Sequence, residues 1–117
     1  MAEKSDRKES SEPKVIKIGS VFKISYDDGK VVERVVTDVL EPGGFMSATI
    51  FDRNKKNERL SGAGTDLDED FMRGEIIDLW DVDRIIKVYL KSEMCPSESR
   101  MREIFEERLK NPSRIIT

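Results

Sequence analysis

The sequence contains no histidine and a single cysteine among its 117 residues. Without an imidazole, the chain can form neither a serine–histidine nor a cysteine–histidine nucleophile pair, and zinc sites that use histidine are excluded. One cysteine can close no internal disulfide and can build no four-cysteine metal site. We therefore expect no metal and no cofactor. No pair of Asp, Glu, Lys or Tyr residues is marked out by its spacing, so the sequence predicts no catalytic residue.

Aromatic residues are also scarce, at 7% of the chain, whereas charged residues make up 38%. No apolar stretch approaches the ~18 residues that span a bilayer, and the first residues lack the apolar core of a signal peptide. A chain of this length suits one domain of ordinary size. The sequence therefore predicts a cytoplasmic protein with one small core and no contact with a membrane.

Three segments differ in composition. Residues 1–14 carry alternating charges and nothing apolar to bury beyond the first two residues and are predicted to be a disordered tail. Residues 15–91 are rich in β-branched side chains and are predicted to form a β domain. Residues 92–117 are predicted to form an amphipathic helix followed by a short tail.

The β domain is predicted from the two-residue period of its side chains. Phe22, Ile24 and Tyr26 alternate with polar residues, and the turn Asp27–Lys30 contains the Asp-Gly pair of a tight hairpin. The return strand, Lys30–Leu40, changes its buried face partway, which indicates a bend. The further β segments are predicted at 45–52, around residue 60, at 74–79 and at 82–90, with a polar turn at 53–59 and a loop at 62–64.

After Lys91 the apolar period lengthens to that of a helix. Ser97 is the predicted N-cap, and Asn111–Pro112 ends the helix. One narrow apolar stripe at helical spacing consists of Met101, Ile104, Phe105 and Leu109. Five to six short antiparallel strands followed by one helix predict a mainly β fold: a small, bent, SH3/Sm-type β-barrel with a C-terminal helix packed over one end.

Two charge clusters admit more than one interpretation. The turn at 53–59 concentrates Arg53, Lys55, Lys56 and Arg59, which suits contact with phosphates. Residues 15–91 carry 12 basic and 15 acidic side chains, however, and this balance favours a solvated hairpin tip. Asp66, Asp68 and Asp70 match the start of a calcium loop, but its later Gly and Glu positions are missing, so an acidic surface loop is the better interpretation. Trp80 lies in an apolar run and is predicted to be a core residue.

Four short motifs resemble the WYL domain, a small SH3/Sm-type barrel of transcriptional regulators and defence-associated proteins. They are residues 24–30, 33–36, 43–48 and 80–85. A looser likeness to Sm-like proteins lies at 51–57 and 73–76. The WYL resemblance implies a module that senses nucleic acid or a nucleotide-like ligand, and it transfers Arg34 and Arg84 as ligand contacts.

Two functions follow as hypotheses. The first is a non-catalytic, regulatory binding module for short nucleic acid or a nucleotide-like anion, with these phosphate contacts: Arg34, Lys55, Lys56, Arg59 and Arg84. The second is a protein-interaction adaptor that binds another protein or a second copy of itself. It would use a strand edge or the helix stripe of Met101, Ile104, Phe105 and Leu109. Exposure of that stripe is the observation that separates them. An enzyme remains a third possibility.

Overall fold

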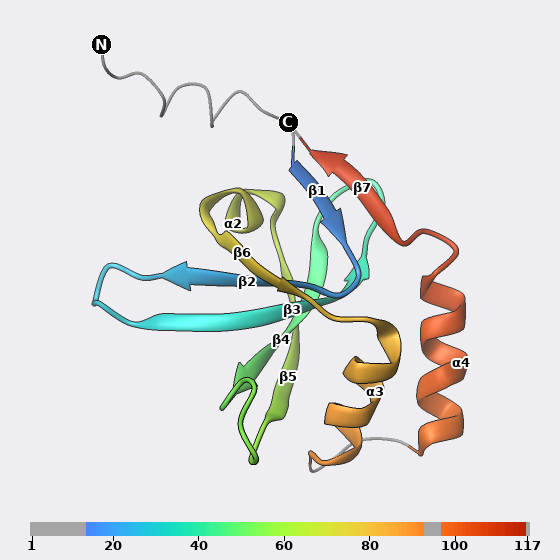
Figure 1. The fold of residues 1–117 in the computed structure, drawn as a ribbon. Coiled ribbons are helices and arrows are strands. Elements are labelled where there is room, and N and C mark those ends of the chain that lie inside the picture. The colour runs from blue at the N-terminus through green and yellow to red at the C-terminus, as the bar shows by residue number, and fades with distance from the viewer. Residues whose placement is uncertain (1–13, 93–96, 117) are drawn as a thin grey trace.

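The computed structural model describes residues 14–92 and 97–116, and Figure 1 traces their path. The predicted disordered tail lies outside the described residues, except that Lys14 begins the first strand. The elements are, in chain order, β1 (Lys14–Lys17), β2 (Ser20–Ser25), β3 (Val31–Val39), β4 (Phe45–Phe51), β5 (Arg59–Asp66), α2 (Asp68–Arg73), β6 (Glu75–Leu79), α3 (Val82–Leu90), α4 (Glu98–Arg108) and β7 (Ser113–Ile116). The fold is mainly β, as predicted. None of the described helices is long and apolar enough to cross a membrane.

The strands form an open sheet and do not close into the predicted small, bent barrel. Five antiparallel strands lie in the order β5-β4-β3-β2-β6, and β1 and β7 form a separate two-stranded ribbon. Closure fails because a helix takes the place of a pairing strand at the β5 edge. The hydroxyl of Ser92, just after α3, accepts the outward backbone N–H of Leu60 at 3.0 Å.

Residues 82–90, predicted as a strand, form helix α3. The Asp81 carboxylate caps this helix by accepting the backbone N–H of Arg84 at 2.8 Å, which is the ordinary role of Asp at an N-cap. Ile85, Ile86 and Val88 are buried, whereas Asp83 and Lys87 are exposed. The β-branched composition suggested a strand, but burial of one helical face in the core determines the structure.

Two further expectations differ from the structure. The predicted loop at 62–64 lies within β5, because Gly62 (φ +76°) and residue 63 form a bulge opposite Ala48. The predicted acidic loop is also wrong, because Asp66 ends β5 whereas Asp68 and Asp70 lie in the short helix α2. The bend expected in the return strand is present as an extra residue, Thr37, where the pairing of β3 with β4 shifts. Ser97 caps α4 as predicted, by accepting the N–H of Arg100 at 3.3 Å.

Helix α2 covers half of one face of the sheet. Its Phe71 packs edge-to-face against Phe22 of β2 and Phe45 of β4, with ring centroids 5.3 and 5.7 Å away, and all three rings are buried. Such edge-to-face contacts add to the stabilisation that comes from burying the rings. This aromatic cluster is the core of the half that α2 covers.

The β1–β7 ribbon fixes α2 at both ends. The Lys14 ammonium of β1 donates to the carbonyls of Phe71, Met72 and Gly74 at 2.9–3.3 Å, at the negative end of the helix. Arg114 of β7 forms a two-pronged pair with Asp68 at 2.6 and 2.8 Å. Strands from the two ends of the described chain therefore hold the helix that seals the aromatic cluster.

Candidate functional site: the open half of the sheet

Over the other half of the same sheet face, none of the helices and strands within residues 14–92 and 97–116 is packed. Strand register sets which side chains share this face, because neighbours paired across strands point the same way and successive residues alternate. Arg34 pairs with Thr49, Thr49 with Ser61, and Phe51 with Arg59. Val32, two residues before Arg34 in β3, belongs to the same face. We define the open face by six residues: Val32, Arg34, Thr49, Phe51, Arg59 and Ser61.

The open face is cationic and carries an exposed aromatic ring. Phe51 is 40% exposed, and the Arg59 guanidinium lies 4.9 Å from the centre of its ring. None of the six side chains is a carboxylate. Asp52, beside the face, pairs with Arg59 at 3.3 Å, but both partners are about half exposed. An exposed pair of this kind contributes little, so a phosphate can replace the carboxylate.

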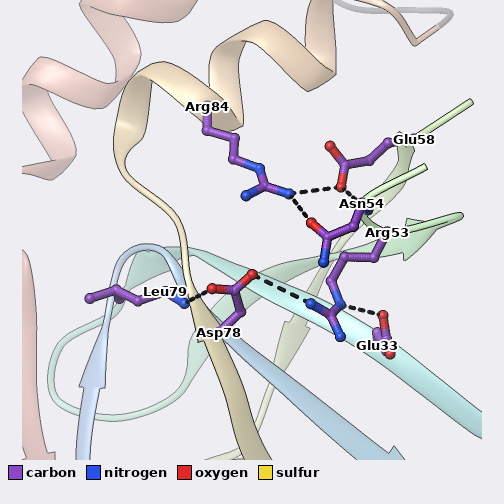
Figure 2. Close-up of polar contacts among 7 residues, drawn as sticks. All are labelled: Glu33, Arg53, Asn54, Glu58, Asp78, Leu79 and Arg84. Atoms are coloured by element: carbon purple, nitrogen blue, oxygen red, sulfur yellow. Dashed lines mark hydrogen bonds and ion pairs between the residues drawn. The ribbon is translucent and has the colours of Figure 1, made fainter. Parts of the chain in front are cut away.

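Two carboxylates of the sheet, Glu33 and Asp78, lie on the opposite face, where they share one arginine partner. Glu33 accepts from Arg53 Nε at 2.8 Å, and Asp78 of β6 accepts from Arg53 Nη1 at 3.4 Å (Figure 2). The hydrogen bond that Arg53 donates to Glu33 is the main cause that raises the pKa of Arg53, so the guanidinium remains charged. Arg53 therefore anchors the start of the β4–β5 turn beneath the sheet and pairs with two carboxylates there.

Helix α3 holds the same turn from a second side. Arg84 donates to the Asn54 amide oxygen at 2.7 Å and to the Glu58 carboxylate at 3.0 Å (Figure 2). Glu58 in turn accepts the backbone N–H of Asn54 at 2.7 Å, and Asn54 has the left-handed φ of +66°. The Arg84 guanidinium also lies 4.3 Å from the centre of the Trp80 ring. These contacts give the turn one defined conformation.

The turn also carries two lysines that take no part in these contacts. Lys55 and Lys56 are exposed, and within residues 14–92 and 97–116 neither forms an ion pair. Their backbones are fixed, since Lys55 N–H donates to Asp52 and Lys55 C=O accepts from Glu58. Two exposed lysines thus lie in the turn that joins Phe51 to Arg59.

The structure divides the five predicted anion contacts into three groups. Arg34 and Arg59 lie together on the open face, although they are far apart in sequence. Lys55 and Lys56 lie in the adjoining turn. Arg84 lies behind the turn and is bound to Glu58, so its first role is to position the turn.

The predicted partner-binding stripe packs largely on the chain itself. In α4, Phe105 is 1% and Met101 5% exposed, and Ile104 is half-buried. Leu109, at the C-cap, is 42% exposed. Figure 1 places α4 alongside α3. The stripe therefore contributes to the core of this chain, with Leu109 as its exposed end.

The three aspartates of the incomplete calcium motif each have an internal partner. Asp66 accepts from Ser47, Asp70 from Arg73, and Asp68 from Arg114 and the Gly44 N–H. The Arg114 hydrogen bond is the main cause that lowers the pKa of Asp68. Within the described ranges, no group of three potential metal ligands comes together.

Phe51 is the functional candidate that the sequence alone did not indicate. It lies at the end of an apolar strand and looks like a core residue. The available signal was its place beside the basic turn, two residues before Arg53. Its exposure follows only from the register of β4 and β5.

Comparisons with protein-family models, with curated proteins and with solved structures find no match.

Proposed function

We propose that this protein binds single-stranded nucleic acid on the open face of its sheet. In this proposal the Phe51 ring stacks on a base, and Arg34, Arg59, Lys55 and Lys56 contact phosphates. The WYL and Sm-like resemblance of the sequence favours the same class of ligand, now for an open sheet.

The observation that carries the proposal is the exposed Phe51 ring beside the Arg59 guanidinium, next to a turn with two exposed lysines. The open face and its turn offer arginines, lysines and an aromatic ring, whereas Glu33 and Asp78 are bound to Arg53 on the other side. An aromatic ring flanked by cations is the combination that binds single strands without reading their sequence, because every base has a face that can stack. The net charge of −3 is therefore compatible with local binding of an anion.

The first experiment measures binding by fluorescence anisotropy with labelled single-stranded oligonucleotides of about 12 residues. If two or three phosphates are neutralised, affinity falls on the order of ten-fold between about 50 and about 200 mM salt. The double variant Lys55→Glu/Lys56→Glu removes two cations and adds two repulsive charges. We expect it to abolish binding at the lower salt.

A matched control changes the same charge elsewhere. Lys17→Glu/Lys110→Glu alters two exposed lysines that lie in β1 and just after α4, away from the open face. We expect this control to bind nearly as well as the wild type. Equal loss in the two double variants would reduce the effect to net charge, and affinity that does not depend on salt would refute phosphate contact.

A further inference from the structure

A cluster of three polar side chains lies where the open face meets the half that α2 covers. It consists of Arg34, Ser47 and Asp66. The buried Ser47 hydroxyl donates to the Asp66 carboxylate at 2.6 Å and accepts from Arg34 Nη1 at 3.4 Å. Arg34 and Asp66 are themselves half-buried. One fixed hydroxyl thus holds a guanidinium donor and a carboxylate acceptor close together.

Gly64 leaves room beside this pair. It is the cross-strand partner of Ser47 and precedes Asp66 by two residues, so its missing side chain belongs to the same face as both. A Cβ built at Gly64 would have no heavy atom within 4 Å. A glycine in a strand often marks close approach of a ligand or another backbone, and here the space above it is open.

We infer that Arg34 and Asp66 read a guanine base that lies over Gly64. This inference rests on the proposed function, adds base preference to it, and gives Arg34 a base contact in place of a phosphate contact. Guanine is the only one of the four bases that presents two neighbouring N–H donors, N1–H and N2–H, beside a carbonyl acceptor, O6. A carboxylate accepts both donors, and an arginine donates to O6. On the edge that faces the carboxylate, adenine, cytosine and uracil each have a single nitrogen that donates, so none of them can fill both acceptor positions.

The inference predicts a preference that stacking cannot produce. We compare labelled single-stranded dodecamers of alternating uridine and guanosine with dodecamers of alternating uridine and adenosine, which stack as purines without the guanine edge. We expect the guanosine strand to bind on the order of ten-fold more tightly, as a well-made pair of hydrogen bonds to a base edge requires. A strand of uridine alone gives the baseline for phosphate contact.

Two variants test the residues separately. Asp66→Asn keeps an oxygen that can accept from Ser47 but replaces the second acceptor by an amide donor, so it removes the guanosine preference and leaves binding of the uridine strand intact. Gly64→Val fills the open space and also removes the preference; it is tolerated because the space is empty and valine suits a strand. The control Thr65→Val places a valine one residue later, where the side chain lies on the other side of β5. We expect this control to keep the preference for the guanosine strand.

The outcomes separate this inference from the proposed function. If all wild-type dodecamers bind equally, or if Asp66→Asn keeps the preference, the guanine inference is wrong while nucleic-acid binding stands. If no dodecamer binds, the proposed function is wrong, and titration with guanosine and uridine monophosphates then decides the inference. Shifts of the Gly64 and Asp66 amide resonances with the guanine nucleotide alone would support a site for the free base, and identical responses to both nucleotides would refute it.

Discussion

The two halves of one sheet face differ in nearly every property, although they share strands. In the half under α2, Phe22 and Phe45 are sealed by Phe71, and their rings are fully buried. In the half that no helix covers, Phe51 lies open to solvent among cations. The same alternation of side chains produces both halves, and the covering helix makes the difference.

This contrast separates stability from binding. Buried aromatic rings contribute to the free energy of unfolding through the apolar area that folding removes from water. An exposed ring contributes little to that free energy and remains available to a ligand. The covered half should therefore control whether the protein folds, and the open half what it binds.

The largest expected effect comes from Phe71→Ala. This substitution opens a cavity between Phe22 and Phe45 and removes the contact that fixes α2 on the sheet. We expect a loss of about 3–5 kcal/mol in the free energy of unfolding. Urea titration followed by the fluorescence of Trp80, the single tryptophan, measures it. A loss below about 1 kcal/mol would mean that α2 does not seal a core, and the comparison of the two halves would fail.

A smaller effect is expected from Asp68→Asn, which weakens the ribbon's hold on α2. The variant loses a charged hydrogen bond to Arg114, and we expect a destabilisation of about 1–2 kcal/mol at neutral pH. Because Arg114 lowers the pKa of Asp68 in the folded protein, this stabilisation is complete above the ordinary carboxyl pKa of 3.8 and is lost as the pH falls below it.

Urea unfolding of wild type and Asp68→Asn at neutral pH and near pH ~3 measures this dependence. The difference between the two proteins should shrink in acid, since the wild-type carboxyl then begins to take up its proton. A difference that stays constant would show that the charge of Asp68 does not contribute, and that the amide serves as well.

Local patterns predicted the parts of this fold whose cause is local. The Asp-Gly turn after Tyr26 and the N-cap Ser97 were found because each depends on a few neighbouring residues. Helix α3 was missed because Ile85, Ile86 and Val88 favour a strand by composition, while their burial depends on contacts far away in sequence.

The candidate site was predicted only in part, for a related reason. The sequence marks Arg53 and Lys55 as equal members of one basic cluster. In the structure, Arg53 forms ion pairs with Glu33 of β3 and Asp78 of β6. Lys55 forms no ion pair with any of the described residues. The sequence contains each of these residues, but it does not state which strands lie side by side. Only the strand register identifies the exposed members of the cluster and adds Phe51 to them.

The smallest effect on stability and the sharpest test of the comparison come from Phe51→Ala. It makes the same chemical change as Phe71→Ala, and both rings lie on the same side of the sheet. Phe51, however, is 40% exposed and lies in contact with the Arg59 guanidinium. We expect less than about 1 kcal/mol of destabilisation, because little area returns to water and an exposed cation–π contact is weak. Loss of one stacked base should nevertheless weaken oligonucleotide binding on the order of ten-fold. Urea unfolding and anisotropy on the same preparation give both values. If Phe51→Ala unfolds the protein as readily as Phe71→Ala, the open half is a second core; if it leaves both stability and affinity unchanged, the ring has no part in binding.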